Sequence, residues 1–116
     1  MLILKPKKVR LQGKTRTCIQ AWKLLRRRAD GTLGPLFINR KLVIAPGKWL
    51  RAEDHPTKGY AHRPGWHAAP SAHAPHLSVK GRVWCKVWLQ NWKQLVRPAV
   101  QGGAWYLAEE MLVEPQ

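Results

Sequence analysis

The chain has 116 residues, which is enough for one hydrophobic core and too few for two domains. No apolar run approaches the roughly 20 residues that a membrane-spanning helix needs, so we expect no membrane partner. Its 21 Lys and Arg residues stand against 6 Asp and Glu residues, a formal net charge of +15 that opposes compact folding and is typical of proteins whose partner is a polyanion.

The positive charge is concentrated in the first half of the chain. Residues 1–50 carry 13 Lys and Arg residues against a single acidic residue, Asp30. We divide the chain into a basic N-terminal arm, residues 1–17, and a single β-rich domain, residues 18–116. The first segment is expected to be a flexible arm that follows a phosphate backbone, an edge strand, or an unstructured extension.

An Asp30-Gly31 step separates two apolar runs. A two-residue hairpin turn needs φ > 0 where Gly supplies it, so this step is a strong hairpin signal. Residues 21–28 and 33–39 are therefore predicted to be paired antiparallel strands. The pattern of residues 18–28 alone fits one face of a helix about as well as it fits a strand, and the Asp30-Gly31 step favours the strand.

Two further segments before the middle of the chain are predicted to be short. Residues 41–44 are expected to form a third strand, which ends at Pro46-Gly47. Residues 48–53 form either a fourth strand or one helical turn.

A long loop is predicted from Asp54 to Leu77, because the segment is rich in Pro and Gly. All five histidines of the chain lie between His55 and His76. A loop of this length in a small domain is disordered or functional, and its aromatic and imidazole side chains argue against disorder.

The clearest strand signal follows the loop, over residues 78–89. Small apolar side chains, Val83, Cys85 and Val87, alternate there with aromatic and cationic ones. Bases of a single strand stack on Trp rings while Lys and Arg contact phosphates. This mixed face is therefore either a nucleic-acid platform or a second hydrophobic layer that the loop or a helix covers.

Three elements complete the chain. Residues 91–96 are predicted to form a short helix, residues 98–103 a loop, and residues 104–113 a last strand with a bulge or break. The expected fold is mainly β, a small antiparallel sheet or open barrel with one long His/Pro/Gly-rich loop across or beside it.

Basic residues on both sides of the loop are candidates for phosphate contacts. Three consecutive arginines precede the Asp30-Gly31 turn, and a solvated charge run is the alternative reading for them. The predicted nucleic-acid-binding residues are Arg26, Arg27, Arg28, Arg40, Lys41, Arg82, Trp84, Lys86 and Trp88.

The histidines of the loop allow a catalytic interpretation. His62 and His67 would act as general acid and base in metal-independent RNA cleavage, with Arg63 on the phosphate and Tyr60 nearby. The spacing matches no common metal-ligand pattern, and Asp54 is the one carboxylate among them, so no metal and no cofactor is predicted. The alternative is a loop whose imidazoles hydrogen-bond to the backbone and brace the fold.

The two cysteines, Cys18 and Cys85, have no CxxC spacing, and no signal peptide pattern opens the chain. Both features favour a cytoplasmic protein with two buried free thiols.

The motif Arg63-Pro64-Gly65-Trp66-His67 resembles one in uncharacterised small proteins of phages and prophages. The resemblance runs over residues 22–87 and includes Val83-Trp84-Cys85-Lys86-Val87. It implies the cytoplasm of a bacterial host and an accessory or counter-defence role, and it carries no known activity.

Three functions are compatible with the sequence. The preferred one is a non-enzymatic protein that binds nucleic acid, with RNA or single strands favoured, or a ribonucleoprotein. The second is a small ribonuclease that uses His62 and His67. The third is a counter-defence inhibitor that docks on a host protein or ribonucleoprotein through its basic face.

Overall fold

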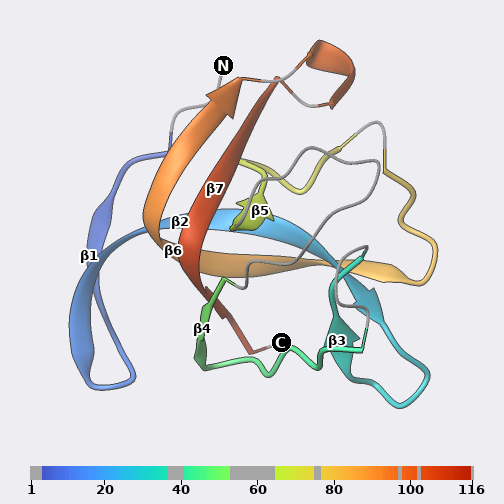
Figure 1. Cartoon of the computed structure of the whole chain (residues 1–116), viewed down its shortest axis with the longest axis horizontal. Coiled ribbons are helices and arrows are strands. Elements are labelled where there is room, and N and C mark those ends of the chain that lie inside the picture. Colours follow the sequence, from blue (N-terminus) through green and yellow to red (C-terminus); the bar gives the residue numbers. More distant parts are fainter. Residues whose placement is uncertain are drawn as a thin grey trace.

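The computed structural model describes residues 4–36, 41–52, 65–74, 77–96, 98–101 and 103–115. As predicted, these residues are nearly all β, and they form an open, strongly curled antiparallel sheet, a half-barrel (Figure 1). The strands are β1 (Lys7–Leu11), β2 (Lys14–Arg27), β3 (Leu33–Gly34), β4 (Trp49–Arg51), β5 (Trp66–Ala68), β6 (Arg82–Val96) and β7 (Ala104–Val113), and a 3-10 turn, η1 (Ala99–Gln101), precedes β7.

Three long strands, β2, β6 and β7, form the centre of the sheet, whose order is β1-β2-β6-β7-β4. The first half of β6 pairs with β2, and its second half pairs with β7. The short strands β3 and β5 pair with β2 and β7. An isolated bridge between Trp22 and Ala69, with two backbone hydrogen bonds of 2.8 and 2.7 Å, links the segment after β5 back to β2. This bridge joins two distant parts of the curled sheet at one point.

The core lies on the concave face of the sheet. Every second residue of β2 and β6 points there, as the alternation around Val87 predicts. The largest fully buried side chains that belong to this core are Ile19, Leu25, Ile44, Leu89, Met111, Val87, Val113 and Cys85. Burial of their apolar surface is the main favourable term that holds the long strands together.

The first strand pair is a hairpin that begins at Lys7. Its two-residue turn, Gln12-Gly13, has φ angles of 52° and 76°, which match the positive values of the tight turn that suits the twist of paired strands. Of the alternatives for the N-terminal segment, the described residues from Lys7 onward therefore form an edge strand and its turn. Gln at the first turn position made this hairpin harder to recognise than Asn or Asp would have.

The hairpin predicted at Asp30-Gly31 is confirmed, but of the predicted strand over residues 33–39 only Leu33–Gly34 is a strand among the described residues, and residues 37–39 lie outside them. Gly31 has a φ of 86°, and the Asp30 carboxylate accepts hydrogen bonds from the Thr32 hydroxyl and backbone N–H at 2.7 and 2.9 Å. These hydrogen bonds from Thr32 lower the pKa of Asp30. The turn is thus held by its own side chains, which explains why local sequence was sufficient to find it.

Two predictions for the middle of the chain need correction. The predicted third strand over residues 41–44 is reduced to one isolated bridge, between Ile44 and Leu33. For residues 48–53 the prediction left open a strand or a helical turn. The strand is confirmed, since β4 lies in this segment. The predicted loop from Asp54 to Leu77 contains β5, because its backbone groups find partners on β7.

Gly65 allows β5 to approach β7 closely. Its φ is 140°, and a Cβ at this position would lie 2.5 Å from the Leu107 Cδ1 atom. The glycine of the Arg63-Pro64-Gly65-Trp66-His67 motif therefore has a packing reason within the fold.

The prediction of a helix over residues 91–96 is wrong, because β6 continues to Val96. The apolar residues of this segment fit a helix in isolation, but its backbone pairs with β7 from Trp92↔Ala108 to Val96↔Ala104. Asn91 adopts a φ of 54°, and it interrupts the ladder opposite Glu109. At this point β6 and β7 bend together, which makes the strong curl visible in Figure 1.

We expect Asn91→Val to destabilise the fold by about 1–2 kcal/mol, because a β-branched residue is disfavoured at positive φ. Asn91→Gly should be tolerated or slightly stabilising, since Gly adopts this conformation freely. Urea denaturation measures both free energies of unfolding. Lys93→Val, at an exposed position of the same strand, is the control for the Val side chain; equal effects of the two Val substitutions would contradict a special role for the bend.

Candidate nucleic-acid interface

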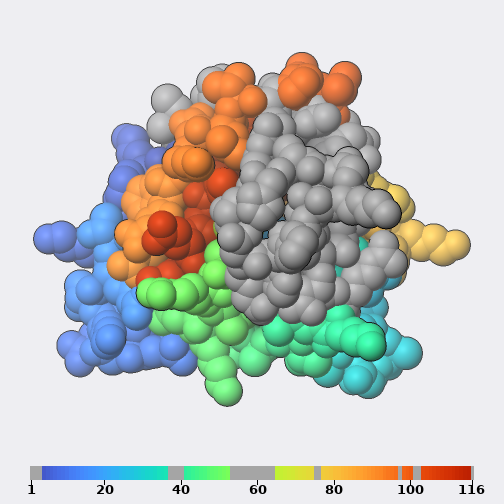
Figure 2. Space-filling model, viewed as in Figure 1, coloured from blue at the N-terminus to red at the C-terminus, as the bar shows by residue number. Residues whose placement is uncertain are grey.

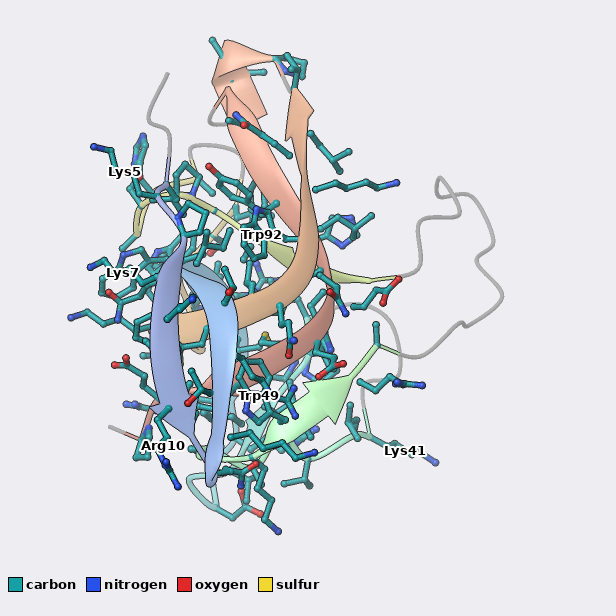
Figure 3. All side chains as sticks on the ribbon, turned by 90° about the vertical axis from the view of Figure 1, so that its left-hand side faces the viewer. Lys5, Lys7, Arg10, Lys41, Trp49 and Trp92 are labelled. Atoms are coloured by element: carbon teal, nitrogen blue, oxygen red, sulfur yellow. The ribbon has the colours of Figure 1, made fainter. Side chains whose placement is uncertain are left out.

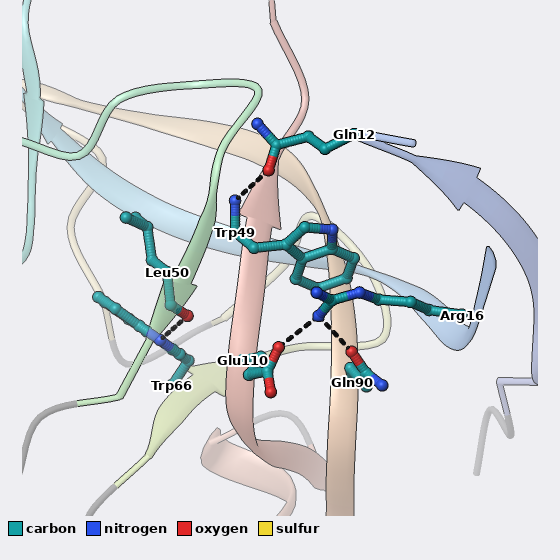
Figure 4. Close-up of polar contacts among 7 residues, drawn as sticks. All are labelled: Gln12, Arg16, Trp49, Leu50, Trp66, Gln90 and Glu110. Atoms are coloured by element: carbon teal, nitrogen blue, oxygen red, sulfur yellow. Dashed lines mark hydrogen bonds and ion pairs between the residues drawn. The ribbon is translucent and has the colours of Figure 1, made fainter. Parts of the chain in front are cut away.

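Arg16 attaches the β1–β2 hairpin to the convex face of the sheet (Figure 4). Its Nη1 donates to Gln90 Oε1 at 2.6 Å and forms an ion pair with the Glu110 carboxylate. Its guanidinium lies 4.5 Å from the centre of the Trp49 ring, a cation–π contact. The Arg16 and Glu110 side chains are 18% and 19% exposed, so water screens this pair only partly.

The turn of the hairpin reaches a distant strand. Gln12 Oε1 accepts a hydrogen bond of 3.1 Å from the backbone N–H of Trp49 at the start of β4. Since β4 and β1 stand at opposite ends of the sheet order, the hairpin must cross the convex side of β6 and β7 to make this contact. Cys18 and Leu112, whose side chains point to that convex side, are 0% and 3% exposed.

The hairpin presents a group of exposed cations with no acidic residue among them (Figure 3). Lys8 and Arg10 stand opposite Thr17 and Thr15 in the strand pair, on the side away from the sheet. We call five side chains the basic ribbon: Lys5, Lys7, Lys8, Arg10 and Lys14. Within the described part of the chain none of them has a hydrogen-bond or ion-pair partner. In Figure 2 the hairpin's side chains project from the left margin of the molecule.

The arginines that the sequence marked for phosphate contacts hold loops in place. Arg28 donates to the backbone carbonyls of Leu33 and Leu42 at 3.1 and 2.8 Å. Arg26 donates to the carbonyl of Leu36 at 3.1 Å. Their guanidiniums thus tie β2 to the segments on both sides of β3, and the alternative of a freely solvated charge run does not describe them.

The remaining predicted cations differ in their surroundings. Arg82 Nη1 donates to the Ser78 carbonyl at 2.9 Å. Arg27 and Lys41 are exposed, and Arg40 lies outside the described residues. The predicted phosphate contacts of these four residues stay a prediction.

The predicted aromatic platform lies on the convex face. Trp22 faces Lys86 across the β2–β6 pair, and the Lys86 Nζ atom lies 5.6 Å from the centre of the Trp22 ring. Trp84 and Trp88 flank this pair along β6, and both are half-buried, whereas Lys86 is exposed. The indoles therefore contribute to packing and retain some accessible surface, and the nucleic-acid platform stays a prediction.

Lys23 is a half-buried cation that the sequence analysis did not select. It lies on the concave side, where its Nζ donates to the His67 carbonyl at 2.6 Å and stands 5.9 Å from the centre of the Trp66 ring. Burial lowers the pKa of Lys23 to about 8. Trp66 is itself fixed by a hydrogen bond of 3.0 Å from its indole N–H to the Leu50 carbonyl. The sequence feature that could have identified Lys23 is its position in a strand where every second residue, Ile19, Ala21 and Leu25, is apolar.

Most of the predicted catalytic group lies outside the described residues, namely His62, Arg63 and Tyr60. His67 belongs to β5, and its backbone carbonyl accepts the hydrogen bond from Lys23. The arrangement of His62 and His67 as acid and base therefore stays a prediction. In the described parts of the chain, no three His, Cys, Asp or Glu side chains lie together as a metal site would require.

The prediction of two buried free thiols is confirmed. Neither Cys18 nor Cys85 forms a disulfide, and the two are buried on opposite faces of the sheet. Burial raises the pKa of both thiols. They are therefore poor candidates for nucleophiles, because the thiolate is the reactive form.

Comparison with known proteins adds no identification. No family model, no curated protein and no solved structure matches this chain. Among the residues that the structure describes, no helix has the length and apolar character needed to cross a membrane. The candidate interface is therefore argued from the geometry alone.

We expect Arg16→Met to destabilise the fold by about 1.5–3 kcal/mol, because it removes charged hydrogen bonds from a partly buried carboxylate and amide. Arg10→Met, which removes an exposed cation from the same hairpin, is the matched control and should change stability little. A double-mutant cycle with Glu110→Gln, measured by urea denaturation, isolates the ion pair. Additive effects of Arg16→Met and Glu110→Gln would show that the pair is not an anchor.

Lys23 predicts a dependence of stability on pH. Its pKa is about 8 in the folded protein against an ordinary value of 10.5, so between these pH values the unfolded chain binds more protons. The free energy of unfolding should therefore rise with pH across this window, by at most about 1.4 kcal/mol per pH unit. Below about pH 8 the folded state carries the cost of burying the charge.

The measurement compares urea denaturation of the wild type and of Lys23→Met from pH 7 to pH 10. The difference in stability between the two proteins should shift in favour of the wild type as the pH rises. Lys8→Met, at an exposed position, accounts for the general loss of positive charge at high pH. Parallel pH profiles for wild type and Lys23→Met would contradict the lowered pKa of Lys23.

Proposed function

We propose that the protein binds nucleic acid without cleaving it, with RNA or single strands as the favoured class. The observation that carries the proposal is the basic ribbon on the β1–β2 hairpin. Four exposed cations of the hairpin and Lys5 just before it stand there, with no acid among them and no partner in the described chain. A phosphate backbone is a repeating polyanion, and unpaired surface cations bind it by releasing its condensed counterions.

The composition of the hairpin supports this proposal over a purely structural role. The anchoring contacts of the hairpin come from Gln12 and Arg16, so the lysines are not needed to hold it. Like charges in close sequence repel one another and cost stability. A partner that neutralises them explains why the chain tolerates this cost.

The convex aromatic face supports single strands within this class. Lys7 pairs with Cys18, two positions along β2 from Gln20, and Gln20 in turn pairs with Trp88. The basic ribbon and the Trp88 side of the platform therefore adjoin along β2. A strand whose phosphates follow the ribbon would bring its bases toward accessible indole surface, where stacking is tolerant of sequence.

A ribonucleoprotein offers the same phosphate chemistry as free RNA, so the basic ribbon serves that partner equally well. The counter-defence role implied by the phage resemblance would be one setting for it, in the cytoplasm of a bacterial host. In both cases the first contact is electrostatic, and its strength should depend on salt.

The test removes two cations of the ribbon with the variant Lys8→Gln/Arg10→Gln. Affinity for a fluorescent single-stranded oligonucleotide is measured by anisotropy over a range of salt concentrations. The wild type should bind more weakly as salt rises, and the variant should lower the slope of log affinity against log salt by about 1.4, or 0.7 for each lost phosphate contact.

The matched control is Lys80→Gln/Ser71→Glu, which lowers the net charge by the same amount at exposed positions outside the hairpin. Equal losses in the two double variants would place binding outside the ribbon. Affinity that does not change with salt would refute the proposal. Incubation with labelled RNA, with and without chelator, reports cleavage; product that forms in chelator would favour the ribonuclease instead.

A further inference from the structure

The β6–β7 hairpin ends in an exposed apolar tip. The two strands pair as far as Val96↔Ala104, and η1 stands beyond their ends at the top of Figure 1. Among the described residues, Val96 and Val100 are the two most exposed large apolar side chains, at 79% and 69%. Pro98 and Ala99, which lie between them in the chain, are exposed as well. We call these four residues, Val96, Pro98, Ala99 and Val100, the apolar tip.

The apolar tip is closed by a hydrogen bond of its own. The Gly103 N–H donates to the Pro98 carbonyl at 3.2 Å, and Gly103 has a φ of 82°. The ring of Pro98 holds its φ near one value. Because the turn is already ordered, its burial against a partner loses little conformational entropy. Contiguous exposed apolar surface of this kind is typical of a contact site.

The start of the basic ribbon adjoins one face of this hairpin. The Leu4 backbone N–H donates to the Tyr106 hydroxyl at 3.2 Å, and Lys5 follows directly. Tyr106 pairs with Gln94, two residues before Val96. Paired residues share a face of the sheet, and so do residues two positions apart on one strand. Val96 therefore lies on the face of the hairpin that contacts Leu4.

The basic ribbon and the apolar tip form one surface. Figure 3 shows Arg10, Lys7 and Lys5 in order toward the end of the molecule that carries the tip. Neither residues 4–14 nor residues 92–108 contain an acidic residue. A nucleic acid offers phosphates to the cations and base faces to the apolar side chains. An anionic lipid surface fits less well, because side chains at a membrane interface are typically Trp or Tyr and the tip has neither.

We propose that the apolar tip inserts between two neighbouring bases of a bound single strand, while phosphates of that strand contact the basic ribbon. This inference rests on the proposed nucleic-acid binding and adds a contact with the bases. Apolar wedges separate stacked bases, at a cost that burial of the wedge and the phosphate contacts offset. The contact is tolerant of sequence, because apolar side chains do not read hydrogen-bonding groups on a base edge.

The test uses Val96→Ser/Val100→Ser, which removes apolar surface from the tip without a change in net charge. Val43→Ser/Val79→Ser is the matched control, at positions that are 55% and 60% exposed and lie outside the β6–β7 hairpin. The probe is single-stranded oligo(dA) with one 2-aminopurine at its centre, whose fluorescence rises when the neighbouring bases no longer stack on it. Thermal melts report whether each variant folds.

Binding of the wild type and of the control should raise the emission of the probe. Val96→Ser/Val100→Ser should bind roughly three- to tenfold more weakly, and it should lose most of the emission rise even at saturation. Its affinity should keep the salt dependence of the wild type, because the basic ribbon is intact. If the double variant does not fold, Val100→Ser alone takes its place, since Val100 lies outside the strands, and it should show smaller changes of the same kind.

Three results would overturn the inference, and they are distinguishable. Equal emission and affinity for the tip variant and the control would remove the tip as a base contact, while salt-dependent binding through the basic ribbon would stand. Loss of binding to phosphatidylglycerol vesicles by the tip variant, with full oligonucleotide binding retained, would assign the tip to a lipid surface. Absence of any oligonucleotide binding at low salt would remove this inference and the proposed function together.

Discussion

The partly buried contact of Arg16 with Glu110, Gln90 and Trp49 decides where the most basic part of the chain lies. A two-stranded hairpin alone is marginal in water, so it needs an attachment to the sheet. Arg16 supplies it with a guanidinium whose charge a carboxylate neutralises. The neighbouring cations then stay exposed, because one arginine of the hairpin meets the structural need.

The same attachment depends on the bend in β6 and β7. Gln90 and Glu110 are paired in register immediately beside Asn91, where positive φ turns both strands away from β2. The residue with unusual backbone geometry in β6 thus stands next to the two residues that receive the Arg16 side chain.

The sequence predicts what local patterns determine and misses what distant pairing determines. The Asp30-Gly31 hairpin and the alternation around Cys85 follow from turn chemistry and from period two, and both are confirmed. The second half of β6 was expected as a helix, since only the register with β7 makes it a strand. Alternation also predicts that Trp84 and Trp88 share one face of β6. The lysines of residues 5–14 show no such pattern, so the sequence does not distinguish a flexible arm from an edge strand there.

The division of labour between arginine and lysine explains why Arg26 and Arg28 hold loops in place while the lysines of the hairpin stay exposed. A guanidinium presents several donors in a fixed plane, so it can satisfy two or more backbone carbonyls at once, as Arg28 does. An ammonium on a flexible stem is strongly hydrated and gains little from such a role, so it stays at the surface. In this fold the arginines at positions 16, 26, 28 and 82 have structural acceptors, and the basic ribbon is mostly lysine. The density of charge in the sequence therefore says less about an interface than the number of free carbonyls within reach of each cation.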